Sequence, residues 1–213
     1  MAQPFINQKK TIAVSLESTA ILDIAWPDGS ENMGGMAAYF YYAPRSSFAK
    51  NGIPNVPESP ASLDDAAVID CAQDGIGYNF KTGKGWNKMY ITRDTSGVVC
   101  EPQGEVDGKS FLNKFSFVHP GNKRRALGFA RYANNTPMIL LVPESDGTLR
   151  QLGSENLPVN FDNITPTTGA TTAERKQISF ECSYPSTSPA PIVLGYDPLD
   201  DAASLSTSSS TTA

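Results

Sequence analysis

The feature that most constrains this fold is a strict alternation of side chains near the end of the chain. Residues 177–184 place Ile178, Phe180, Cys182 and Tyr184 on one side and polar residues on the other. Successive side chains of a strand point to opposite faces of a sheet, so this pattern predicts a strand with one buried face. Such a strand needs partner strands and a second layer that covers its apolar face.

Upstream of this strand the sequence predicts another alternating strand. Residues 109–118 place Phe111, Phe115 and Phe117 on one face, and a His-Pro-Gly-Asn sequence at 119–122 ends the run. Proline and glycine at these positions predict a turn, because proline cannot donate to a sheet and glycine tolerates unusual backbone angles.

The one clear helix is predicted at residues 123–133. Ala126, Phe129, Ala130 and Ala133 recur at i, i+3, i+4 and i+7, which gives a single apolar face. The sequence Asn-Asn-Thr-Pro that follows closes the helix. One face is apolar, so we expect this helix to pack against the outside of a sheet.

Short alternating or apolar runs between turn residues predict the remaining strands. These runs are residues 10–16, 22–26, 36–42, 76–81, 86–93, 97–101, 138–142, 148–152 and 192–194. Residues 36–42 are apolar on both faces and are expected to be covered on both sides. Residues 153–174 are polar, contain Pro158 and Pro166, and predict irregular structure.

A long irregular loop is predicted at residues 43–62, which contain four prolines and few periodic apolar positions. Proline stiffens such a segment and lowers the entropy lost on docking, so we expect an extended arm that contacts a neighbouring subunit or ring. The sequence after it leaves two alternatives open, a short helix at residues 66–69 or a strand at 67–71.

Many short strands, 17 glycines and 16 prolines predict a mainly β protein. The expected architecture is an antiparallel β-sandwich or barrel with one short helix packed outside and the long proline-rich loop. Residues 1–195 are expected to form a single domain. Residues 196–213 are rich in Ser, Thr, Asp and Ala, offer little apolar surface to bury, and are expected to be a disordered tail.

Composition argues against a nucleic-acid binder. The net charge is −5, and no basic run exceeds the three residues at 123–125, so the chain lacks the basic stripe that neutralises phosphates. The three cysteines, Cys71, Cys100 and Cys182, fit no zinc spacing. Cys182 is expected to be a buried free thiol, and the cysteine usage indicates assembly in a reducing cytoplasm.

Motifs for chemistry are equally sparse. The single histidine, His119, precedes a proline and has no identifiable partner, so we interpret it as a turn residue rather than a base. Gly83-Lys84-Gly85 lacks the remainder of a phosphate loop and predicts a turn. We expect no catalytic, cofactor-binding or metal-binding residue and no enzymatic activity. We also expect no signal peptide and no membrane anchor, because no apolar run approaches about 20 residues.

Aromatic residues leave a second functional class open. Tyr39, Tyr41 and Tyr42 on one strand, together with Trp86 and Tyr90, are able to form a ring platform for a carbohydrate. Rings at alternate strand positions more often belong to a core or a subunit interface. A carbohydrate-binding β-sandwich is therefore the alternative function.

The order of elements and turns in residues 109–184 carries a resemblance. Its parts are a phenylalanine-rich strand, Pro120-Gly121-Asn122 leading into a short helix, the strand at 137–142, Asp146-Gly147, Arg150-Gln151-Leu152-Gly153-Ser154, Thr168-Gly169, Ala173-Glu174-Arg175-Lys176 and the final alternating strand. In this order the stretch resembles part of a tail-tube protein of a tailed bacteriophage, a virion structural protein.

The resemblance implies a structural subunit that self-associates into rings, commonly hexamers, which stack into a tube. Implied partners are other tail or neck proteins and DNA, which passes through the lumen without specific binding. The implied location is the virion, after assembly in the host cytoplasm, and no cofactor is implied. An acidic composition suits such a conduit, because basic residues in the lumen would hold the phosphates.

Overall fold

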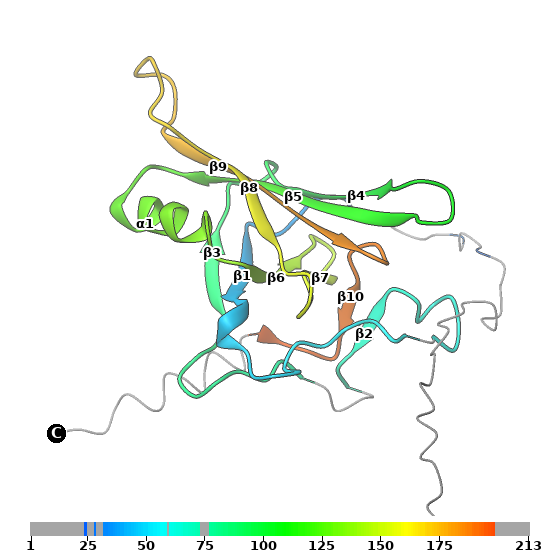
Figure 1. Cartoon of the computed structure of the whole chain (residues 1–213). Helices are drawn as coiled ribbons and strands as arrows, with labels where there is room; N and C mark the ends of the chain where they lie inside the picture. The colour runs from blue at the N-terminus through cyan, green and yellow to red at the C-terminus, as the bar shows by residue number, and fades with distance from the viewer. Residues whose placement is uncertain (1–23, 25–27, 29–31, 59, 73–76, 199–213) are drawn as a thin grey trace, which may run out of the picture.

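The computed structural model describes residues 24, 28, 32–58, 60–72 and 77–198 (Figure 1). The strands predicted at residues 10–16 and 22–26 lie outside this part, apart from residue 24. The described elements are β1 (Tyr39–Pro44), the 3-10 helix η2 (Arg45–Ser47), β2 (Val68–Asp70), β3 (Asn87–Tyr90), β4 (Gly97–Gln103), β5 (Ser110–Pro120), α1 (Arg124–Ala133), β6 (Met138–Pro143), β7 (Leu149–Leu152), β8 (Asn160–Thr167), β9 (Gln177–Ser186) and β10 (Ile192–Leu194).

These strands form two sheets that face each other as a sandwich (Figure 1). One sheet has six strands in the order β2-β10-β7-β6-β1-β3, and the other has four in the order β4-β5-β9-β8. The four-stranded sheet is antiparallel throughout. The prediction of a mainly β fold with one short helix is confirmed. Of the two predicted architectures, sandwich and barrel, the structure has the sandwich.

The first core cluster fills the space between the two sheets. Phe117 on β5 stacks on Phe180 of β9 with ring centroids 4.8 Å apart, and it also meets Phe40 of β1 at 4.7 Å. Each of these side chains is at most 1% exposed. Fully burying one such side chain contributes on the order of 1.5–3 kcal/mol, so this aromatic cluster is a main source of stability. The alternation predicted around Phe117 and Phe180 is confirmed.

Helix α1 closes one side of the sandwich. Ala126, Ala130 and Ala133 are buried, as the spacing predicted, and their small side chains let the helix lie close to the first core cluster. Phe129 reaches further and contacts Tyr42 of β1 at 4.9 Å between ring centroids. The helix therefore packs against the first core cluster through its alanines and against β1 through Phe129.

A second core cluster covers the other face of the six-stranded sheet. It joins Tyr41 and Leu141 of the sheet to Phe48, Ile53 and Trp86 from the loops below it. The expectation that residues 36–42 are covered on both sides is confirmed for β1, because Phe40 lies in the first cluster and Tyr41 in the second.

The loop at residues 43–62 differs from the extended arm that was expected. Residues 52–54 are buried, and the backbone N–H of Ala49 donates to Asn79 O at 2.9 Å while Asn79 N–H donates to Gly52 O at 2.9 Å. The arm predicted at residues 43–62 is therefore anchored to its own sheet at Phe48 and at residues 52–54, because Phe48 and Ile53 supply apolar surface to the second core cluster. Contact of the loop with a neighbour, which its exposed residues Asn55, Pro57 and Glu58 are free to make, stays a prediction.

The largest correction to the predicted elements is β8, which lies in a stretch expected to be irregular. The strand pairs with β9 and turns Phe161 and Ile164 toward the first core cluster. A register shift between Phe161 and Asn163 places these two apolar residues three positions apart, so the period-two pattern is hidden. Pro166 is tolerated because β8 is an edge strand.

Smaller differences concern element ends. Strand β5 continues through His119 and Pro120, which pair with Ile178 and Gln177, so His119 is a strand residue rather than a turn residue. Of the two alternatives after the long loop, the structure has the strand, β2. The run predicted at residues 76–81 forms only an isolated bridge between Phe80 and Phe48 in its described part.

The start of the expected tail also packs on the fold. Tyr196 lies against the second core cluster, and its hydroxyl accepts a hydrogen bond from Trp86 Nε1 at 2.7 Å. Its ring centroid is 4.6 Å from that of Tyr78. The disorder predicted for residues 196–213 is therefore wrong for Tyr196, and residues 199–213 lie outside the described part of the chain.

Candidate functional site

Two surfaces of the described residues are the candidate sites, and their hollows carry opposite charge. The first is the outer face of the four-stranded sheet, which we call the open face. The second is a groove between α1 and the edge strand β3, which we call the helix groove. Neither was identified by residue in the sequence, because each is assembled from elements that are far apart along the chain.

The open face is built from the side chains that alternate with the core residues of β4, β5, β9 and β8. Most cross-strand neighbours on it are polar, such as Ser116 opposite Glu181 and Ser179 opposite Thr165, and the exposed Val99 is an apolar exception. Figure 1 shows this sheet as one outer layer of the sandwich, with one face toward the other sheet and the open face away from it. The strands thus present a broad polar surface on one side and the aromatic core on the other.

Carboxylates dominate the charge of the open face. A shallow hollow of about 460 Å³ there is lined by Glu101, Asp162 and Glu181 and by one cation, Lys114, which gives a net charge of −2 from three carboxylates and one ammonium. Lys114 Nζ lies 2.6 Å from Glu101 Oε2. Because the ammonium is neutralised by Glu101, the face offers phosphate groups no unpaired cation in this hollow.

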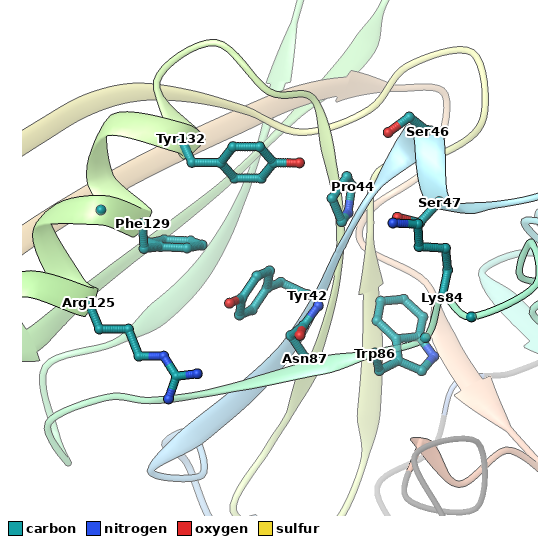
Figure 2. Close-up of a pocket in the computed structure, with 13 residues that line it drawn as sticks. Tyr42, Pro44, Ser46, Ser47, Lys84, Trp86, Asn87, Arg125, Phe129 and Tyr132 are labelled. Atoms are coloured by element: carbon teal, nitrogen blue, oxygen red, sulfur yellow. The ribbon is translucent and has the colours of Figure 1, made fainter. Parts of the chain in front are cut away.

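The helix groove runs between α1 and the strands β1 and β3. Two adjoining hollows of about 580 and 290 Å³ share Tyr42, Asn87, Arg125 and Phe129. Figure 2 shows Arg125, Phe129 and Tyr132 projecting from α1 toward Tyr42 and Asn87. The aromatic walls come from residues on both elements, and the helix is held there by its alanine face.

The charge of the helix groove is positive. Lys84, Lys88 and Arg125 line it, and no aspartate or glutamate does. The cations that face the groove are Lys84 and Arg125, because Lys88 Nζ lies 3.7 Å from the centroid of the Tyr39 ring, on the other face of the sheet from Tyr42. Burial raises the pKa of Tyr42, and the positive charge of Arg125 opposes that rise. The groove therefore favours an anionic or acidic occupant with some apolar surface.

The predicted chemical residues are dispersed. His119 Nδ1 lies 2.8 Å from the backbone oxygen of Tyr90, which only accepts, so this nitrogen carries the proton. Gly83, with φ of 73°, forms a turn beside Lys84 at the end of the helix groove. In residues 32–58, 60–72 and 77–198, together with 24 and 28, no three His, Cys, Asp or Glu side chains gather to hold a metal.

The cysteines are free thiols, and the prediction for Cys182 is confirmed. Cys182 is 2% exposed, Cys71 is 8% exposed and Cys100 is half-buried. Burial raises the pKa of the Cys182 thiol well above its ordinary value. Cys182 therefore behaves as a core residue on the inner face of β9, opposite Phe115 of β5 and Phe161 of β8.

The aromatic platform proposed from the sequence is not assembled as one surface. Tyr41 and Trp86 are buried in the second core cluster, whereas Tyr90 is 55% exposed. Tyr42 contacts Phe129 in the wall of the helix groove. The rings thus divide between a core and a groove, and a carbohydrate would meet Tyr90 and Tyr132 rather than Trp86.

Comparison with known proteins yields no relative: no family model, no curated protein and no solved structure matches this chain. Among the helices of the described residues, none has the length and apolar character to cross a membrane.

Proposed function

We propose that this chain is a structural subunit of a phage tail tube, which assembles into rings that stack around a conduit for DNA. The observation that carries the proposal is the open face. It is a polar sheet surface with an acidic hollow, backed by an aromatic core that gives it rigidity. A conduit wall needs this combination, because it must keep its shape and must not bind the passing polyanion.

The charge of the open face supports free passage of DNA. Duplex DNA carries one negative charge for about each 1.7 Å of its axis, and proteins that bind it release counterions through unpaired lysines and arginines. On the open face the cation Lys114 is paired with Glu101, and Asp162 and Glu181 add negative charge. Phosphates approaching this surface are repelled weakly rather than held.

The edges of the same sheet support ring formation. Strands β4 and β8 are its two outermost strands, so each has one side without a strand partner in the described fold. Open edges are templates for pairing with another chain. Pairing β4 of one copy with β8 of the next would continue the sheet around a ring and keep the open face on one side of it.

Electron microscopy of concentrated purified protein tests the proposal. We expect rings or hollow tubes. A matched pair of variants asks which face lines the lumen: Ser116→Cys on the open face and Arg131→Cys on α1 outside the helix groove, each treated with a maleimide too large to enter a closed tube. Labelling should be lost on assembly for Ser116→Cys but retained for Arg131→Cys.

Two results would overturn the proposal. One is a monomer at every salt and protein concentration tried. The other is retardation by an immobilised polysaccharide that is lost in Tyr90→Ala, because this would favour the carbohydrate-binding alternative. Trp86→Ala is unsuitable for that test, since Trp86 is 6% exposed and its loss would damage the second core cluster.

A further inference from the structure

The hairpin that joins β4 to β5 ends in an unusual tip. Val106 is 82% exposed and is flanked by the exposed acidic residues Glu105 and Asp107. A largely exposed valine between two carboxylates has no role in folding that its contacts explain. A single exposed apolar residue is common on protein surfaces, so the tip becomes informative only through its fixed conformation and a surface that matches it.

The tip has a defined conformation. Gly104 has φ of 98°, and a Cβ there would lie 2.5 Å from Gly108 O, so only glycine fits. The backbone N–H of Gly108 donates to Glu105 O at 3.1 Å, and Asp107 has φ of 67°. The turn therefore holds Val106 and its two carboxylates outward in advance, which reduces the entropy lost when they bind.

The helix groove is complementary to this tip. It offers the aromatic rings of Tyr42, Phe129 and Tyr132 to an apolar side chain, and Lys84 and Arg125 to carboxylates. No acidic residue lines it, in a chain whose net charge is −5. Complementary charge steers association and fixes its register.

The tip cannot enter the groove of its own chain. The tip precedes β5 and α1 follows it, so the 11 residues of β5 separate them by about 35 Å. Figure 1 shows the hairpin tip and α1 at opposite ends of the four-stranded sheet. A contact between them must therefore join two copies, head to tail along the strand direction.

We propose that the β4–β5 hairpin tip of one copy docks in the helix groove of a second copy, with Val106 against the aromatic rings and Glu105 and Asp107 beside Lys84 and Arg125. The contact is heterologous, so it repeats from copy to copy. The contact between tip and groove extends the assembly along the strand direction, whereas pairing at the sheet edges extends it across the strands. On the proposed function, edge pairing closes a ring and the tip stacks one ring on the next.

A charge-reversal experiment tests the contact. The groove-reversed protein carries Lys84→Glu and Arg125→Glu, and the tip-reversed protein carries Glu105→Arg and Asp107→Asn, because asparagine tolerates a positive φ. Each protein alone should need at least a tenfold higher concentration to form head-to-tail oligomers. An equimolar mixture should recover wild-type assembly, because every tip then meets a groove of opposite charge. Sedimentation velocity and electron microscopy give the readout.

The controls are Arg131→Glu, on α1 outside the groove, and Asp64→Arg, an exposed acidic residue far from the tip in sequence. Both should assemble like wild type, and all variants should keep the wild-type melting temperature. Val106→Ser should weaken assembly without any charge change.

The outcomes separate this inference from the tube proposal. Single rings that no longer stack in either reversed protein support both. Head-to-tail oligomers that depend on Arg125 and Glu105 but enclose no lumen support the contact and overturn the tube. Normal stacked tubes from both reversed proteins overturn the contact and leave the tube standing. Wild-type protein that stays monomeric overturns both.

Discussion

The side-chain amide of Gln151 on β7 donates a hydrogen bond of 3.0 Å to the backbone oxygen of Pro54 in the long loop. The same nitrogen donates to Gly153 O at 2.9 Å, and the amide oxygen accepts from the Tyr78 hydroxyl. Gln151 is 2% exposed, so all of these groups are withdrawn from water. A single buried glutamine thus fixes the loop to the six-stranded sheet.

Replacing Gln151 should be costly although it carries no charge. Gln151→Leu removes the partners of the Tyr78 hydroxyl and the Pro54 oxygen, and leaving buried polar groups unpaired costs about 1–3 kcal/mol each. We expect the free energy of unfolding, measured with urea, to fall by about 3 kcal/mol. Gln103→Leu, at the half-buried end of β4, is the control and should change it by less than about 0.5 kcal/mol. Equal values for the two variants would contradict the role of Gln151.

The loop should divide into a structural part and an exposed part. Ile53 is 6% exposed in the second core cluster, so Ile53→Ala should destabilise the fold by about 2–4 kcal/mol. Glu58 is exposed, and Glu58→Lys should leave the melting temperature unchanged. If residues 55–58 contact a neighbour, Glu58→Lys weakens assembly without unfolding. A stable Ile53→Ala variant would show that the loop is not anchored as described.

The end of the ordered fold is testable by truncation. A chain that stops after Gly195 loses Tyr196, which accepts the Trp86 hydrogen bond at 2.7 Å and packs on Tyr78. We expect a loss of about 2 kcal/mol in thermal or urea unfolding, whereas a chain that stops after Pro198 retains these contacts. Tyr196→Phe keeps the ring and removes the acceptor, and should cost about 1 kcal/mol. Identical melting temperatures for the two truncations would show that the ordered fold ends at Gly195.

Alkaline pH should destabilise the protein through its buried tyrosines. Burial raises the pKa of Tyr78 and of Tyr184 well above their ordinary value of 10.0. The unfolded chain loses these protons near pH 10 while the folded chain retains them. The stabilisation is therefore complete below about pH 10 and declines as pH rises toward the folded pKa.

Each such tyrosine steepens the decline by up to about 1.4 kcal/mol per pH unit. Urea unfolding between pH 9 and 11.5 should give a shallower slope for Tyr78→Phe than for wild type. Ser46→Ala, which alters an exposed residue and removes no titratable group, should keep the wild-type slope. A Tyr78→Phe slope equal to wild type would contradict this assignment.

The sequence predicted elements best where one face is buried without interruption. The alternation at Phe180 and the spacing of Ala126 and Ala130 report burial directly, because each element has a constant period. β8 was missed since the bulge after Phe161 breaks the period and Pro166 suggests a loop. An edge strand with one covered face leaves only a weak apolar signal.

The candidate surfaces were beyond prediction for a different reason. The helix groove places Lys84 and Arg125 in the walls of one hollow, and the open face brings Glu101 beside Lys114, through pairings that no local pattern encodes. In the sequence, Arg125 lies on the polar side of an amphipathic helix and cannot be told apart from an ordinary solvated residue. Only the topology shows that Lys84 and Arg125 line one hollow without a carboxylate and that Glu101, Asp162 and Glu181 line another.

Hydrogen exchange should rank the strands by their place in the sheets. β9 lies between β5 and β8, and its residues Ile178, Phe180 and Cys182 are at most 2% exposed, so its amides should exchange only on global unfolding. β8 is an edge strand with mostly exposed side chains, so its amides should exchange sooner in the monomer.

Phe180→Asp would place a charge in the aromatic cluster and should prevent soluble folding, whereas Thr165→Asp on the open face should fold normally. If β4 and β8 pair between copies, assembly should slow exchange in β8 while leaving β9 unchanged. Fast exchange across Ile178 to Cys182, or soluble Phe180→Asp, would show that the main core lies elsewhere.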